Sequence, residues 1–287
     1  MNIQFQAKTL PLAIAYLVLC GLPGRAEEYK TAEDAFRAGA RLHNQRDYRA
    51  AQAPLEAALA LAPNDAYRLK VYNGLVASYR LLPEPEKMIE ACEFVMLHTK
   101  SFPERSNVSR MLHSFLFNRG LADSQRQRYE AQAEKSPDDV VALSMLVAIL
   151  SADRKERALA EPFQQRLREV ERKQAGELAA ESEAAAANSP AEATWHWKEA
   201  ATRWIQADDK VKALAAANKA TALGPDMRSD LLRHFWHRQI GEVYLNAGEF
   251  KLAVEQLQQA IDTTTIQGYK DECQKELEEA QAKLAGQ

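Results

Sequence analysis

Residues 194–225, TWHWKEAATRWIQADDKVKALAAANKATALGP, decide how the rest of the chain is interpreted. Trp197 and Trp204 lie two helical turns apart on one stripe, and the alanines between them leave room for a neighbouring backbone. A second set of small residues follows at steps of four and three, namely Ala213, Ala217 and Ala220. Pro225 then ends this second helix. The stretch predicts two helices that cross closely in a hairpin.

One such hairpin cannot bury its own apolar face, so it requires neighbours of the same kind. Two further copies of the spacing are present. One consists of His237, Ile240, Gly241, Tyr244, Ala253, Leu257 and Ala260, and the other of Ala38, Gly39, Leu42, Ala51, Leu55, Ala58 and Pro63. The spacing and residue types resemble the tetratricopeptide-repeat family, whose unit is about 34 residues long, over most of the chain.

The resemblance implies an all-α, right-handed α-solenoid of about six helix hairpins with a C-terminal capping helix. We expect a signal peptide at 1–26, an array of about four units at 27–171, and a pair of units with the capping helix at 194–287. Between them, the Ala- and Glu-rich stretch 172–193 has strong helix propensity but little to bury, so it is interpreted as a solvated helical extension or a linker.

The first 26 residues have the organisation of a secretory signal. Lys8 precedes an apolar run from Leu10 to Cys20, and small residues end at Ala26, where we expect cleavage. A lipoprotein signal that would anchor Cys20 to a membrane is the alternative, but Leu19 stands where a small residue is expected. We therefore expect an exported protein in the periplasm or outside the cell.

The charge balance bears on the class of partner. The full chain has 37 basic and 40 acidic residues, and removing Lys8 and Arg25 with the signal leaves 35 against 40, a net charge of −5. This mild acidity argues against nucleic acid or an anionic membrane as the main partner. The two remaining cysteines, Cys92 and Cys273, are expected to be unpaired helix-packing residues.

No catalytic motif is recognisable, so we expect no enzymatic activity and no cofactor. His234 and His237 lie three residues apart on one expected helix, which makes a metal site conceivable. Because no carboxylate or cysteine completes a ligand set at a readable spacing, we expect no metal and interpret both as ordinary helix residues.

The family resemblance implies that first helices line a concave groove that binds a peptide. The residues carried over to that stripe are Trp195, Lys198, Thr202, Ile205 and Gln206 in one unit, Phe235, Arg238, Glu242, Leu245 and Asn246 in the next, and Phe36, Ala40, His43 and Asn44 in the first. Aromatic anchors beside cations suit an extended peptide. The alternative is that Trp195 and Phe235 pack internally while Lys198 and Arg238 are solvated.

We therefore expect a non-catalytic protein-binding scaffold of the cell envelope that captures a partner segment in its groove. The competing hypothesis is a structural subunit of an envelope assembly that acts through self-association. Thr202 and Glu242 occupy positions where family members that clamp a terminal carboxylate use asparagine, so that particular activity is not supported.

Overall fold

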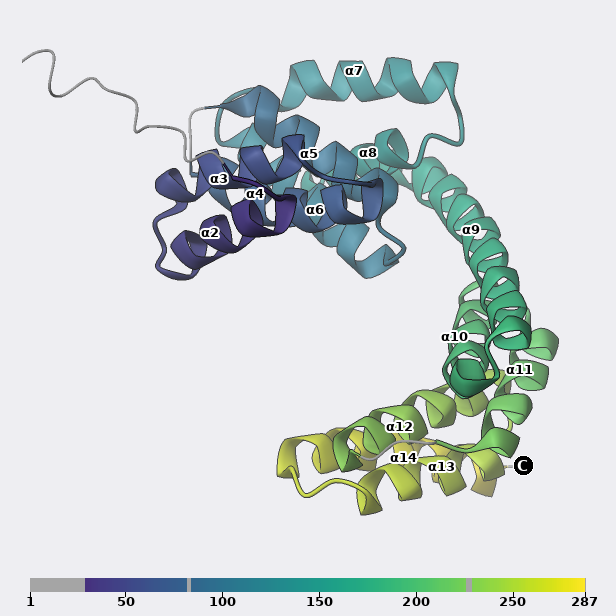
Figure 1. Cartoon of the computed structure of the whole chain (residues 1–287). Helices are drawn as coiled ribbons and strands as arrows, with labels where there is room; N and C mark the ends of the chain where they lie inside the picture. Colours follow the sequence, from purple (N-terminus) through teal and green to yellow (C-terminus); the bar gives the residue numbers. More distant parts are fainter. Residues whose placement is uncertain (1–28, 82–83, 226–228, 287) are drawn as a thin grey trace, which may run out of the picture. The chain divides into compact units, whose positions relative to one another are not determined.

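The protein is all-α. A computed structural model describes residues 29–81, 84–225 and 229–286, and these residues contain helices and no strand. The expected signal peptide at 1–26, with Cys20, lies outside the described residues. Figure 1 shows the thirteen α-helices, which are α2 (Ala32–Asn44), α3 (Tyr48–Ala60), α4 (Asp65–Tyr79), α5 (Pro85–His98), α6 (Phe102–Phe117), α7 (Ala122–Lys135), α8 (Val140–Ala152), α9 (Glu161–Asn188), α10 (Ala193–Gln206), α11 (Lys210–Leu223), α12 (Asp230–Ala247), α13 (Phe250–Asp262) and α14 (Gln267–Ala285). Consecutive helices pack as the pairs α2–α3, α4–α5, α10–α11 and α12–α13, and α14 packs on α13, which confirms the expected all-α fold class.

The chain divides into two compact units. The described part of unit 1 lies within 1–134 and 144–156, and that of unit 2 within 135–143 and 157–287. Short 3-10 turns at Arg157–Ala160 and Pro190–Glu192 precede α9 and α10. The expected boundary at 172–193 separates two arrays of repeats, and it stays a prediction. The boundary between the two compact units lies earlier in the chain, around α8.

Four of the hairpins close with the same hydrogen-bonded corner. A residue with positive φ ends each first helix, namely Arg46, Gly120, Asp208 and Gly248. The next backbone N–H then donates to a carbonyl five residues earlier, and these bonds are Asp47 to Leu42, Leu121 to Leu116, Asp209 to Trp204 and Glu249 to Tyr244, at 2.9–3.0 Å. This is the arrangement by which helices satisfy their last carbonyl groups. The connection from α6 to α7, where the sequence matches the repeat pattern weakly, has the same corner as the other three.

The two helices of a hairpin approach closely because a small residue faces a large one. A Cβ atom added at Gly39 would lie 2.6 Å from Leu55 Cγ, and one added at Gly241 would lie 2.8 Å from Leu257 Cγ. In the α10–α11 hairpin the equivalent positions are Ala201 and Ala217, both fully buried. An alanine pair therefore replaces a glycine–leucine pair and places two fewer side-chain carbons between the helices.

The Ala- and Glu-rich stretch packs against α10 and is not a solvated linker. Helix α9 continues unbroken to Asn188 and lies alongside α10 (Figure 1). Its Ala175 and Ala179 are fully buried, and Trp204 of α10 donates an Nε1 hydrogen bond to Glu183 Oε1 at 2.8 Å. Of the two alternatives, the stretch up to Asn188 is thus the helical extension. The expectation that it has little to bury is wrong, because Ala175, Ala179 and Ala186 are buried.

The final helix acts as the expected cap. Helix α14 buries Cys273, Leu277 and Ala280 at helical spacing, and polar residues occupy most of its other positions. It packs mainly on α13 and also contacts α12. Among the described residues, no helix combines the length and apolar character needed to cross a membrane.

Candidate functional site

The residues expected on the α10 stripe differ greatly in exposure. Lys198 is buried, with 7% of its surface exposed, and its Nζ donates to Gln239 Oε1 of α12. The same Nζ lies 4.6 Å from the centre of the Trp195 ring, which is half-buried against the core of unit 2. Thr202 donates to the Lys198 carbonyl at 3.1 Å, and Gln206 is exposed. Lys198 is thus a fixed part of the α10–α12 contact, and burial lowers its pKa.

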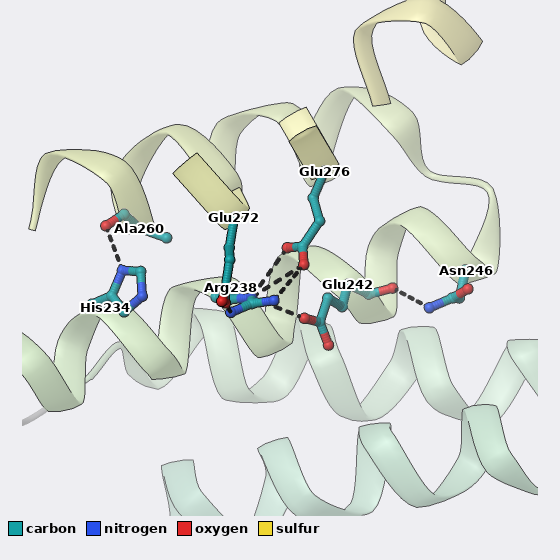
Figure 2. Close-up of polar contacts among 7 residues, drawn as sticks. All are labelled: His234, Arg238, Glu242, Asn246, Ala260, Glu272 and Glu276. Carbon is teal, nitrogen blue, oxygen red and sulfur yellow. Dashed lines mark hydrogen bonds and ion pairs between the residues drawn. The ribbon is translucent and has the colours of Figure 1, made fainter. Parts of the chain in front are cut away.

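On α12, the expected residues Arg238, Glu242 and Asn246 follow one another at each turn (Figure 2), and Phe235 lies one turn before Arg238. Phe235 is half-buried and its ring meets Tyr269 of α14 edge to face, with 5.2 Å between ring centres. Asn246 is exposed and donates to the Glu242 carbonyl at 2.8 Å. Both Trp195 and Phe235 therefore pack internally, in agreement with the alternative weighed for them.

Arg238 is the centre of a polar cluster between α12 and α14 (Figure 2). Its Nη1 lies 2.6 Å from Glu272 Oε2, its Nη2 lies 2.7 Å from Glu276 Oε1, and its Nε lies 3.2 Å from Glu242 Oε1. We call Arg238, Glu242, Glu272 and Glu276 the Arg238 cluster. The alternative in which Arg238 is solvated is wrong, because the capping helix supplies two carboxylates that hold the guanidinium.

The cluster changes the acid–base behaviour of its members. Burial, and then the charge of Glu276, raise the pKa of Glu242, although Arg238 opposes this shift. Burial alone would lower the pKa of Arg238, but the hydrogen bonds that it donates to Glu276 and Glu272 raise it overall. Glu242 is thus a carboxylate whose charge is incompletely compensated.

The structure places the predicted site residues of α10 and those of α12 along one face. Helix α12 lies beside α10 and also contacts α14, and the Lys198–Gln239 bond joins the first two. Of the eight residues predicted as the site, Gln206 and Asn246 are the exposed ones, while Thr202, Glu242 and Arg238 are half-buried. Sequence reasoning missed Gln239, Glu272 and Glu276. The spacing of four residues between Glu272 and Glu276 indicates that both lie on one side of α14. It does not indicate that this side contacts Arg238.

The first-unit stripe contains a separate aromatic contact. Phe36 meets Tyr67 of α4 edge to face, and Lys70 Nζ lies 4.1 Å from the centre of the Phe36 ring. Glu33 accepts hydrogen bonds from Tyr67 and Lys70 at 3.0 and 3.4 Å. These residues join α2 to α4 within unit 1, and we assign them to packing.

Both histidines considered as metal ligands are packing residues. His234 Nδ1 lies 2.8 Å from the Ala260 carbonyl, and His237 Nδ1 lies 2.9 Å from Gln256 Oε1. Residues 29–81, 84–225 and 229–286 contain no group of three or more His, Cys, Asp or Glu side chains that could hold a metal ion. Cys92 and Cys273 are buried free thiols.

Acidification is expected to weaken unit 2 through His237. Burial lowers the pKa of this histidine in the folded protein, so the unfolded chain binds a proton more readily. Stability is therefore complete above the ordinary histidine pKa of about 6.5 and is lost as the pH falls through that value toward the folded-state pKa. Urea denaturation at pH 7.5 and 5.5 measures the effect.

The control for this pH dependence is a pair of matched variants. His237→Gln should reduce the loss of stability between the two pH values, whereas His196→Gln, at a side chain that is 31% exposed, should leave it unchanged. Equal pH dependence in wild type and His237→Gln would contradict the assignment.

Comparison with known proteins identifies no family. No family model matches the chain, and no curated protein matches it. Among solved structures, the chain is similar to a tetratricopeptide repeat protein from Parabacteroides merdae, with a TM-score of 0.31 and 13% identity over 88% of this chain and 100% of that one. A likeness of this size carries no conclusion about function. The fold and its repeated corners define the chain as an all-α protein of successive helix hairpins.

Proposed function

We propose that this chain is a non-catalytic protein-binding scaffold that acts outside the cytoplasm, in the cell envelope. The observation that carries the proposal is the continuous face formed by α10, α12 and α14, where side chains from separate repeats meet. Stacked helical repeats typically bind other proteins on such extended faces. The expected signal at 1–26 supports the proposed location.

The face suits binding because much of it is fixed before a partner arrives. Lys198 is held by Gln239 and by the Trp195 ring, and Arg238 is held by carboxylates from two helices. Side chains that are already ordered lose little conformational entropy when a partner binds. Gln206 Oε1 accepts from Arg203 and Asn246 Nδ2 donates to the Glu242 carbonyl, which leaves Gln206 Nε2 and Asn246 Oδ1 to form hydrogen bonds with a partner backbone.

A steric test avoids the packed rings. Gln206→Trp combined with Asn246→Trp adds bulk at two exposed positions of this face. We expect capture of the partner from an envelope extract to fall at least about tenfold, which corresponds to about 1.4 kcal/mol of binding free energy. The bait is the chain from residue 27 to 287, and captured proteins are quantified by mass spectrometry.

The control variant places the same bulk elsewhere. Gln258→Trp with Gln259→Trp alters two exposed positions of α13 and should retain capture. Undiminished capture by the Gln206 and Asn246 variant would overturn the proposal. A stable homo-oligomer in light scattering, dissolved by that variant, would instead favour the competing structural subunit.

A further inference from the structure

The Arg238 cluster has more negative than positive charge. Three carboxylates, from Glu242, Glu272 and Glu276, surround one guanidinium, so the full ionised set has a charge of one minus three, or −2. The side chains of Glu242 and Glu272 are 42% and 56% exposed. Both can therefore contact a group that approaches from solvent.

The excess negative charge of the Arg238 cluster affects Glu242 most. Burial and the charge of Glu276 raise its pKa even though Arg238 Nε is 3.2 Å away. One guanidinium thus does not fully compensate the acids around it. The remaining negative charge would attract a second cation at this position.

An independent feature of the same α12–α14 seam also calls for a hydrogen-bond donor. His234 lies one turn before Arg238 on α12 (Figure 2), and its ring stacks on Tyr269 of α14 with 5.4 Å between ring centres. Its Nδ1 faces the Ala260 carbonyl, which can only accept, so the proton of the neutral ring is on Nδ1. Nε2 is therefore an acceptor, and it is buried without a partner.

We propose that the α12–α14 seam binds a lysine- or arginine-bearing segment of a partner protein, with its cationic side chains placed against Glu242 and Glu272. This inference rests on the proposed scaffold function and adds the chemistry of the partner. The Phe235 and Tyr269 rings beside the cluster offer apolar and cation–π contacts to the same segment. The face therefore selects a basic partner segment rather than an acidic one.

The test uses peptides of defined charge. Fluorescein-labelled deca-lysine and deca-glutamate are titrated with the chain 27–287, and binding is followed by anisotropy at physiological salt. We expect deca-lysine to bind and deca-glutamate not to bind. Glu242→Gln with Glu272→Gln should weaken the binding of deca-lysine at least about tenfold. Glu276 still holds Arg238 in this variant, and circular dichroism verifies its fold.

A matched variant separates the site from overall charge. Glu249→Gln with Glu255→Gln removes the same charge from the exposed N-cap residue of α13 and from an exposed position within that helix, and it should change deca-lysine binding by less than about twofold. Carbodiimide, which joins a carboxylate to an amine in direct contact, should link the peptide to Glu242 or Glu272. Equal weakening in both variants, or cross-links confined to other acids, would overturn the inference.

The two proposals fail in different ways. If the Gln206 and Asn246 variant abolishes partner capture while deca-lysine does not bind, the scaffold stands and the basic-segment inference is wrong. If deca-lysine binds at the seam but that variant does not affect capture, the inference stands as a local cation site while the proposed scaffold face is wrong.

Discussion

Replacing Gly241 with valine is expected to lower the free energy of unfolding by about 2–3 kcal/mol, because an added side chain has no room in the α12–α13 hairpin. Its Cβ would lie 2.8 Å from Leu257 Cγ and 3.4 Å from the Leu257 backbone nitrogen. The higher helix propensity of valine offsets only about 0.4 kcal/mol of this strain. Urea denaturation followed by tryptophan fluorescence measures the change.

Two further variants show whether the close approach is the cause. Gly268→Val places the same residue where a Cβ meets no atom within 4 Å, so it should be nearly neutral. Adding Leu257→Ala to Gly241→Val should cost less than the sum of the single changes by about 1 kcal/mol or more, because it restores space between the helices. Strict additivity would contradict this account of the hairpin.

Placing a carboxylate at Ala179 is expected to destabilise unit 2 by about 3 kcal/mol or more. Ala179 is fully buried where α9 packs on α10, so Ala179→Glu would bury a charge and displace the packing around Trp204. The result distinguishes a packed helix from a solvated linker, in which glutamate would be harmless.

The neighbouring position supplies the control. Ala180 is exposed on the same helix, and Ala180→Glu should change the free energy of unfolding by less than about 0.5 kcal/mol. Thermal denaturation monitored by circular dichroism compares the two variants at equal pH and salt. Equal stability of Ala179→Glu and Ala180→Glu would show that this stretch does not pack as described.

The hairpins were predictable because their signals are local. The spacing of Trp197, Trp204 and Ala213 sets two helical faces and a turn, and each helix start and stop follows from a few neighbouring residues. The same holds for α14, whose polar character predicted a cap. Residues that repeat at helical spacing report packing directly.

The packing of α9 was not predictable from its own composition. Alanine contributes little to an amphipathic pattern, so Ala175 and Ala179 look like solvated helix residues. Ala179 is buried in a cluster that includes Trp204 of the next helix, and a Cβ atom added at Gly176 would lie 3.4 Å from the Trp204 ring. The missing information lies in the other helix and not in the stretch itself.

The candidate site was predicted in part, for a similar reason. The turn-by-turn spacing of Phe235, Arg238, Glu242 and Asn246 correctly placed them along α12. Their partners come from α14, which begins about thirty residues after Phe235, and no local pattern links Arg238 to Glu272 and Glu276. Whether a cation is solvated or already paired is a tertiary property.

The recurring corner shows that the architecture depends on few side chains. Arg46 and Asp208 adopt positive φ without being glycine, which costs each about 1–2 kcal/mol and shows that the surrounding hydrogen bonds enforce the bend. When these corners and the contacts between a small and a large residue are present, as between Gly241 and Leu257, the fold does not depend on the residues that face solvent. New recognition chemistry can therefore arise on them by single substitutions while the architecture is preserved.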